Sequence, residues 1–338
     1  MINPLKNILF ASTPIFHLES LVKCSKQGLI LPFYHVVSDH NLPHLKHLYP
    51  ITKTVRFNED IDFLKKNYKP IDANYLIQNI NNINFRKEKS FFLSFDDGLR
   101  QFHDEVAPIL LHRGVPATFF VNTAFIDNKD MFYRLKVSIL IEKIKSKNLS
   151  PAEINQINKV FSKASLIYKD AHSLHLINDS SSCLLEEIAA ILEVSFSDFL
   201  ERHQPYLTTN QINSLISQGF QLGSHSVSHP YYPNLTTEEQ VEQTLNSVRF
   251  LVENFAIKNK LFSFPYTDYH VKKAFFDAIE PELDLTFGTA NIKLDEVATN
   301  LQRIPMEVSN RKDAATIVKS EYILYILKRL INKHIIKR

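Results

Sequence analysis

Residues 91–121 contain the pattern that most constrains how this chain can fold. Residues 91–95 form a largely apolar run between a charged segment and Gly98, which is typical of a short strand buried on both faces. Residues 100–113 then place apolar side chains on one helical face, and a second apolar run occupies residues 115–121. A strand, a helix and a strand within so short a span indicate a parallel β-sheet.

Similar alternation extends over most of the chain. Other apolar runs that predict strands lie at residues 28–37, 220–223, 261–264, 285–290 and 301–308. Residues 127–204 are the exception, because they contain helical patterns rich in Lys, Ser, Asn and Ile and no strand signal. We therefore predict an α/β fold in which residues 1–338 form a single barrel-like domain with a helical insertion at about residues 127–204.

The composition limits the classes of partner. The 338 residues include 39 basic and 36 acidic side chains, and the formal net charge of +3 gives no field strong enough to imply nucleic acid. We predict no nucleic-acid partner. Cys24 and Cys183 are the only cysteines, and they lie far apart in no metal-like spacing.

The location of the protein is predicted from segments that could meet a membrane. Residues 1–12 hold an apolar patch too short and interrupted for a secretory signal, and no later run has the length to span a bilayer. We predict a cytoplasmic protein, with an atypical export signal as the weaker alternative. A final helix is predicted at about residues 314–337, and its basic end, which includes Lys328, Lys333 and Arg338, is either solvated or in peripheral contact with the inner membrane surface.

Two adjacent carboxylates, Asp96 and Asp97, follow the strand predicted at residues 91–95. Side chains alternate across a strand, so both carboxylates can share one direction only if the backbone turns there, and Gly98 permits such a turn. One carboxylate could then hold a metal ion while its neighbour handles a proton. Taken alone, however, Asp-Asp-Gly more often solvates a simple chain reversal.

His225 and His229 follow another predicted strand and are four residues apart. Both imidazoles can point to one side of a turn or short helix and chelate a single ion. Together with the strand-end aspartates, they make an Asp-His-His set, which leaves positions on the ion open for water and substrate. An open site indicates catalysis rather than a structural metal.

Three motifs resemble those of a known family. Ser-Phe-Asp-Asp-Gly at 94–98, His-Ser-Val-Ser-His at 225–229 and Phe-Ser-Phe-Pro-Tyr at 262–266 are similar to the first three motifs of the polysaccharide deacetylases, the family four carbohydrate esterases. The resemblance spans about residues 31–308, apart from the helical insertion. It implies a distorted (β/α) barrel with its site at the carboxyl ends of the strands.

The resemblance also implies roles for individual residues. Asp96 would be the general base, and the backbone N–H of Tyr266, next to Pro265, would stabilise the oxyanion. Three side chains would hold a divalent ion, usually zinc in this family: Asp97, His225 and His229. Such ligands also accept cobalt, nickel or manganese.

The sequence departs from the family pattern at several positions. Many members have an arginine where this chain has Ser263, and a glycine where it has Thr267. The C-terminal Leu-x-His motif that normally supplies an acid histidine is also absent. Circularly permuted members carry this motif on the N-terminal side, and residues 31–35 resemble it, so His35 is the predicted acid. A lone histidine at a strand end is otherwise more often structural.

The leading hypothesis is a metal-dependent hydrolase that removes the N-acetyl group from an amino sugar of a polysaccharide or glycan precursor, such as a lipid-linked sugar. Two alternatives stay open. The missing motif arginine at Ser263 is compatible with a catalytically silent barrel that only binds sugar. A metal-dependent deacetylase could instead act on O-acetyl esters or on a non-sugar amide.

Overall fold

Parallel strands form the central sheet of the computed structural model, which describes residues 4–82, 84–308 and 312–338. Within these residues, eight strand segments pair in the order β11-β9-β8-β7-β6-β5-β2-β12, and each pair is parallel. Their bounds are β2 (Pro32–Tyr34), β5 (Leu93–Phe95), β6 (Ala117–Val121), β7 (Gln221–Ser224), β8 (Leu261–Ser263), β9 (Leu285–Gly288), β11 (Asn300–Gln302) and β12 (Ile304–Pro305).

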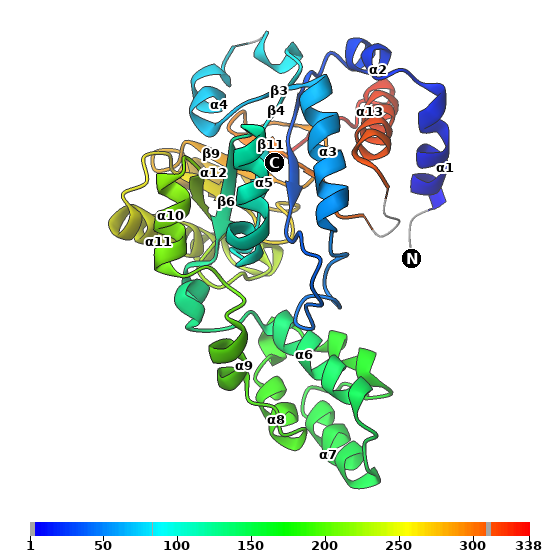
Figure 1. The fold of residues 1–338 in the computed structure, drawn as a ribbon, viewed down its shortest axis with the longest axis vertical. Helices are drawn as coiled ribbons and strands as arrows, with labels where there is room; N and C mark the ends of the chain where they lie inside the picture. The colour runs from blue at the N-terminus through cyan, green and yellow to red at the C-terminus, as the bar shows by residue number, and fades with distance from the viewer. Residues whose placement is uncertain (1–3, 83, 309–311) are drawn as a thin grey trace.

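The segment 300–305 closes the sheet into a barrel. It consists of β11 and β12, which are separated only by Arg303. β11 pairs with β9, whereas β12 pairs with β2 in the register Ile304↔Pro32, so this segment joins the two edges of the sheet. The predicted distorted (β/α) barrel is therefore confirmed (Figure 1).

The strands are apolar on both faces because their inner side chains pack in the barrel interior and their outer side chains pack against the surrounding helices. In β6, Phe120 contacts the barrel interior, where its ring centroid lies 5.4 Å from that of Phe287 in β9. The preceding Phe119 points the other way and stacks on Phe102, at 5.1 Å between ring centroids, in the surrounding helical layer. This arrangement explains why the strands appear in the sequence as continuous apolar runs rather than alternating ones.

Helices lie around the outside of the barrel, and many of them connect one strand to the next in the sequence (Figure 1). Capping boxes begin α10 (Thr209–Ser217) at Thr208 and α11 (Thr237–Phe255) at Thr236, where the side-chain oxygen of each threonine accepts a backbone N–H three residues on. Other helices outside the barrel are α1 (Pro4–Ser12), α2 (Leu18–Ser25), α3 (Thr54–Asn67), α4 (Ala73–Asn79), α5 (Ala107–Arg113) and α12 (Lys273–Ile279). A π-helical segment, Phe102–Val106, precedes α5, and a small sheet of β1 (Leu29–Ile30), β4 (Ser90–Phe91) and β3 (Lys69–Pro70) lies beside the barrel.

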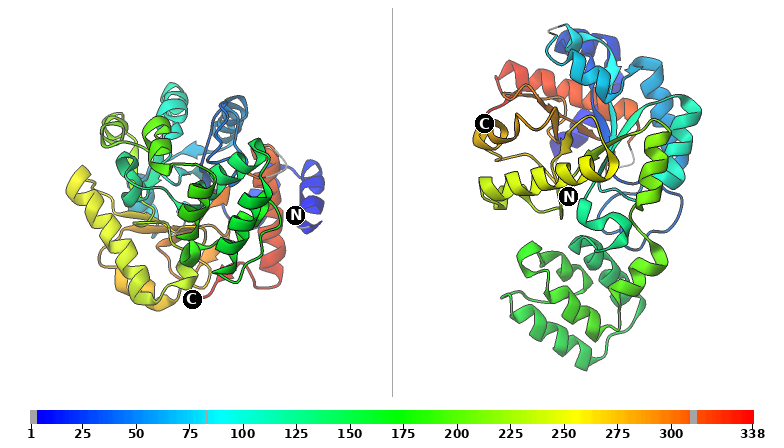
Figure 2. Two further views of the ribbon diagram at one scale, coloured as in Figure 1. Left: turned by 90° about the horizontal axis from the view of Figure 1, so that it is seen from below. Right: turned by 90° about the vertical axis from the view of Figure 1, so that its left-hand side faces the viewer.

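Between β6 and β7 the chain leaves the barrel and forms a group of helices at one end of it (Figures 1 and 2). These are α6 (Tyr133–Ser146), α7 (Pro151–Ser162), α8 (Leu184–Ile191) and α9 (Phe196–His203). They share a hydrophobic core with the loop that follows β2, through Leu42 and Leu45. The helical segment is therefore attached to the end of the barrel at which β2 and β6 finish.

The helix predicted at about residues 314–337 is shorter than predicted. α13 (Ala314–Leu330) ends seven residues earlier, because Asn332 adopts a left-handed conformation with φ of 54°. The Lys333 N–H bonds the Lys328 carbonyl at 2.8 Å and the Asn332 N–H bonds the Arg329 carbonyl, which is the Schellman pattern of helix ends. Beyond it, β13 (Ile335–Ile336) pairs with β10 (Leu294–Asp295).

None of the helices in the described part of the chain is long and apolar enough to cross a membrane. α13 instead packs on the barrel layer, where Tyr322 lies buried beside Tyr68 of the segment that follows α3. Contact of the basic C-terminal segment with a membrane surface stays a prediction.

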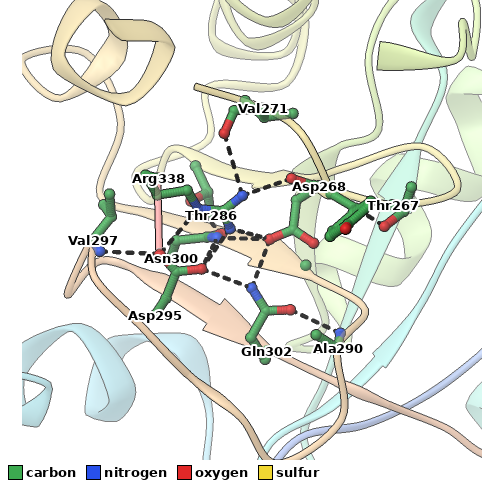
Figure 3. Close-up of polar contacts among 12 residues, drawn as sticks. Thr267, Asp268, Val271, Thr286, Ala290, Asp295, Val297, Asn300, Gln302 and Arg338 are labelled. Carbon is green, nitrogen blue, oxygen red and sulfur yellow. Dashed lines mark hydrogen bonds and ion pairs between the residues drawn. The ribbon is translucent and has the colours of Figure 1, made fainter. Parts of the chain in front are cut away.

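Arg338 is the centre of a buried polar cluster (Figure 3). Its side chain is 1% exposed, and its guanidinium donates to the carboxylates of Asp268 and Asp295 and to the Asp268 carbonyl at 2.6 Å. The side-chain amides of Asn300 and Gln302 also donate to the Asp268 carboxylate, at 2.9 and 2.6 Å. The cluster therefore joins the segment containing β13 to β10, β11 and the loop after β8.

We expect Arg338→Met to lower the free energy of unfolding by about 3–5 kcal/mol, because it leaves two buried carboxylates without their cation. Burial raises the pKa of Asp268 but Arg338 lowers it, and the net pKa lies below its usual value, so this carboxyl is ionised at neutral pH. Denaturant unfolding measures the effect. The control is Lys337→Met, which removes an exposed cation one residue away. Equal losses in the two variants would contradict the prediction.

Candidate active site

Asp96 and Asp97 lie where β5 ends, and the predicted turn occurs at Asp97 itself. Asp97 and Gly98 both have left-handed backbones, with φ of 72° and 63°. A Cβ on Gly98 would lie 3.0 Å from the Val121 side chain, so a larger residue there would be both strained and crowded. The backbone therefore turns as soon as the strand ends, and both carboxyl groups are buried.

His225 and His229 lie in a tight turn after β7. Ser226 and His229 have left-handed backbones, with φ of 72° and 62°, and the Ser226 hydroxyl accepts the His229 N–H at 3.0 Å. The Asn122 side chain, from the end of β6, donates to the His225 carbonyl and holds the turn against the neighbouring strand. Nδ1 of His225 donates to the Ser263 carbonyl at 2.8 Å, which leaves Nε2 as the free ring nitrogen.

Asp97, His225 and His229 converge as the sequence predicted. Nε2 of each histidine lies 3.3 Å from Asp97 Oδ1, and the three side chains are only 2–6% exposed. One donor atom from each residue lies within 4.8 Å of the other two, and within the described residues this is the one such group of possible metal ligands. Asp97 Oδ1 is buried without a hydrogen-bond partner, so a cation between the three residues would satisfy it.

The electrostatics of this cluster also fit a divalent ion. Burial raises the pKa of Asp97, but His225 and His229 lower it, and the net pKa lies well below the usual value. Burial lowers the pKa of His229 more than Asp97 raises it. A carboxylate and a neutral imidazole are the forms of these side chains that bind zinc.

Tyr49 completes the environment of Asp97, and sequence reasoning missed it. Its hydroxyl donates to Asp97 Oδ2 at 2.7 Å, so the second carboxylate oxygen is occupied and Oδ1 is left for an ion. Tyr49 lies in the loop after β2, 48 residues before Asp97. No local pattern in the sequence distinguishes it from a tyrosine that only packs.

Asp96 forms a two-point ion pair with Arg303. Nη1 of Arg303 donates to Asp96 Oδ1 at 2.8 Å, Nη2 donates to Oδ2 at 2.7 Å, and both side chains are buried. The Ser263 hydroxyl accepts from Arg303 at 2.7 Å and lies 3.3 Å from both oxygens of Asp96. Burial raises the pKa of Asp96, whereas Arg303 and then His225 lower it, and the net pKa lies below the usual value.

Arg303 supplies a guanidinium next to Ser263, the position at which many polysaccharide deacetylases have an arginine. The two residues are 40 positions apart in the sequence, and Arg303 comes from the segment that closes the barrel. A signal for it was present in the sequence, since Arg303 interrupts an apolar run predicted to be a buried strand. A buried charge requires a partner, but the sequence does not say which.

His35 lies beside this cluster and is oriented by Glu307. Nδ1 of His35 lies 2.6 Å from Glu307 Oε2, and Glu307 Oε1 accepts the backbone N–H groups of His35 and Val36 at 2.9 and 2.6 Å. The His35 ring stacks on Tyr49, with 4.2 Å between ring centroids. Burial lowers the pKa of His35, but Glu307, Asp97 and Asp96 raise it more, to about 9, so the imidazole is protonated at neutral pH.

Tyr266 occupies a strained turn after β8. Its φ is 58°, and the Thr267 N–H bonds the Pro265 carbonyl at 2.6 Å, which makes a γ-turn around Tyr266. The Tyr266 N–H donates to none of the described residues. The ring of Tyr266 lies 4.7 Å from that of His229, so this turn lies next to the metal-ligand candidates.

The helical segment contributes to the same site. The Phe132 ring, just before α6, lies 4.3 Å from the His229 ring, and the Tyr133 hydroxyl is 3.4 Å from that of Tyr266. No site residue was predicted in this segment from the sequence. Because helical patterns differ little between core and rim positions, only the three-dimensional arrangement identifies these contacts.

Comparison with known proteins agrees with the motifs. A family model described as polysaccharide deacetylase matches residues 84–166 and 178–277, which is more than half of the chain. The match contains Asp96, Asp97, His225, His229 and Tyr266, but it ends before the barrel-closing segment. No curated protein sequence matches this chain.

Several solved structures share the fold at low sequence identity. The deacetylase PplD of Streptococcus pyogenes in complex with acetate has a TM-score of 0.55 and 13% identity, covering 87% of this chain and 97% of that chain. IcaB from Ammonifex degensii has a TM-score of 0.53, 13% identity and the same coverage. A de-N-acetylase from Aggregatibacter actinomycetemcomitans has a TM-score of 0.51 and 15% identity, covering 86% of this chain and 99% of that chain.

We expect Tyr49→Phe to weaken zinc binding about 10- to 100-fold, the usual effect of removing a hydrogen bond that orients a metal ligand. Calorimetric titration of metal-free protein with zinc measures it. The control is Tyr168→Phe, because the Tyr168 hydroxyl, in the helical segment, donates to no described residue. Unchanged affinity in Tyr49→Phe would mean that the bond to Asp97 does not orient this ligand.

We expect Glu307→Gln to lower the pKa of His35 from about 9, because burial alone disfavours the imidazolium and Glu307 opposes this effect. NMR titration of the metal-free protein measures the change. In the wild type, the pKa of His35 is raised from 6.5 to about 9, so protonation of His35 stabilises the folded state. This contribution to stability is complete below pH 6.5 and is lost as the pH rises through about 9. A His35 pKa that is unchanged by the substitution would show that Glu307 does not hold its proton.

Proposed function

Because this chain belongs to the polysaccharide deacetylase family, we propose that it is a metal-dependent hydrolase that removes the N-acetyl group from an amino sugar of a glycan or glycan precursor. One observation carries the proposal: three buried ligand atoms, from Asp97, His225 and His229, converge beside a second, ionised carboxylate. That is the set of groups that hydrolysis of an unreactive acetamide requires.

Asp97, His225 and His229 would hold the divalent ion, most readily zinc, with cobalt, nickel or manganese as alternatives. When bound, such an ion polarises the acetyl carbonyl and lowers the pKa of a water molecule. Asp96 is positioned to accept the proton of the attacking water, because its ion pair with Arg303 keeps it ionised.

Two further groups stabilise charge and complete the proton transfer. The Tyr266 N–H, next to Pro265, donates to none of the described residues and would donate to the oxyanion that develops on the acetyl oxygen. His35 would give its proton to the departing amine, since Glu307 keeps its imidazole protonated at neutral pH.

The environment of Asp96 weighs against a silent, sugar-binding barrel. That alternative was suggested by the absence of the motif arginine at Ser263. Arg303 contacts Asp96 with two hydrogen bonds, so the guanidinium that the base requires is supplied from elsewhere in the chain. We therefore favour a catalytic site over a binding site alone.

The rim of the site supports a sugar substrate. Tyr231 is 38% exposed, and its ring lies 5.6 Å from that of Tyr266. The Tyr133 hydroxyl lies 3.4 Å from that of Tyr266, and the Phe132 ring lies 6.2 Å from the Tyr266 ring, so several aromatic rings lie close to the metal-ligand candidates. Such rings offer apolar faces with polar tips, which suit the mixed apolar and hydroxyl surfaces of a sugar.

We expect zinc-loaded protein to release acetate from N-acetylglucosamine oligomers, and we expect Asp97→Ala to abolish the release together with zinc binding. His35→Gln should keep its zinc and lower turnover by about 10²-fold or more, as expected for loss of a general acid. Coupled assay of acetate and metal analysis by mass spectrometry measure both quantities.

His112→Gln serves as the control, because His112 is exposed on α5 away from the site. Parallel assays with O-acetylated sugars and N-acetylated amines test the alternative substrates. Turnover that persists in Asp97→Ala would contradict the metal-dependent mechanism. Normal turnover in His35→Gln would return His35 to a structural role.

A further inference from the structure

Arg134 presents a cation at the edge of the active site. It is exposed at the start of α6, and the centre of its guanidinium lies 4.8 Å from the Tyr266 ring. The Tyr266 ring is in turn 4.7 Å from the ring of His229, a metal-ligand candidate. Arg134 and the metal-ligand candidate His229 therefore both contact the ring of Tyr266.

The charge of Arg134 is not neutralised within the part of the chain that the structure describes. Its guanidinium donates to the Tyr133 hydroxyl at 3.3 Å and lies over two tyrosine rings, but it forms no ion pair there. Aromatic faces orient a guanidinium without cancelling its charge. The group is thus held in place and still able to bind an anion.

Carboxylates on α6 and on the neighbouring α8 are occupied by other cations. Glu186 accepts from Lys136 at 2.8 Å, two residues after Arg134. Glu142 binds Lys46 at 2.5 Å and His47 at 2.6 Å. Neither acid is paired with Arg134, and this lack of a partner distinguishes Arg134 from Lys136 on the same helix.

We propose that Arg134 forms a subsite for an anionic group of the substrate, either a carboxylate or a phosphate, close to the N-acetyl group that is removed. This inference rests on the proposed deacetylase function and narrows its substrate to an acidic glycan or a sugar phosphate. The planar guanidinium suits both anions, because it can donate two parallel hydrogen bonds to carboxylate or phosphate oxygens.

Three matched substrates test the subsite: N-acetylglucosamine disaccharide, a disaccharide of N-acetylglucosamine and glucuronic acid, and N-acetylglucosamine 1-phosphate. The wild type should have a kcat/KM at least tenfold higher for one or both anionic substrates than for the neutral one. Arg134→Gln should reduce that ratio at least tenfold, and Arg134→Lys should restore part of it. Comparison of the glucuronic acid disaccharide with the sugar phosphate shows whether the subsite accepts a carboxylate, a phosphate or both.

Lys136→Gln is the matched control, since it removes the same charge from the same helix where the cation already has an acidic partner. It should leave the ratio of anionic to neutral turnover unchanged. An equal kcat/KM of the wild type for all three substrates would overturn the subsite, as would equal effects of Arg134→Gln and Lys136→Gln. In either case, acetate release from the neutral disaccharide would leave the deacetylase function standing.

Calorimetric binding of the same three sugars separates the subsite from catalysis. Wild-type protein that binds an anionic sugar at least tenfold more tightly than the neutral one, with the difference lost in Arg134→Gln, supports the subsite even if no acetate is released. Absence of any such difference overturns it. Inorganic phosphate as a competitor shows whether the subsite recognises the anion without the sugar.

Discussion

The buried ion pair between Asp96 and Arg303 is the interaction on which the rest of this structure depends. Removing two charges from water costs several kcal/mol for each ion, and only good geometry with additional hydrogen bonds offsets that cost. Arg303 meets this condition with a two-point contact and a bond to Ser263. Because Arg303 lies in the segment that joins both edges of the sheet, the same segment closes the barrel and supplies the main cation that lowers the pKa of Asp96.

The site also concentrates strained backbone. Asp97, His229 and Tyr266 are not glycines, yet each has a positive φ, a conformation that costs of order 1–3 kcal/mol per residue. Neighbouring hydrogen bonds hold each one, such as the bond from Thr267 to the Pro265 carbonyl. Rigid parallel strands thus hold turns that direct functional groups toward one point, as in other barrels that collect their chemistry at the strand ends.

Much of the site could be predicted from local sequence patterns. The end of the C-terminal helix could also have been predicted from such a pattern, although it was placed too late in the chain. The Asp96–Asp97 pair was recognisable because a buried strand followed by carboxylates and Gly98 is a short-range pattern. The end of α13 was equally local, since Asn332 readily adopts the left-handed conformation that stops a helix, but the basic residues after it were assigned to the helix. The helical segment contains no pattern that separates Phe132, at the site, from an ordinary core residue.

By itself, the sequence determined the alternation of strands and helices, the turns that end the strands, and the Asp-Asp and His-x3-His motifs. These features depend on residues within a few positions of one another. The tertiary structure decided which distant side chains complete the site: Arg303 on Asp96, Glu307 on His35 and Tyr49 on Asp97, over separations of 48 to 272 residues. Barrel closure brings these partners together, because it places the ends of distant strands on one face. Local sequence preferences therefore cannot identify them.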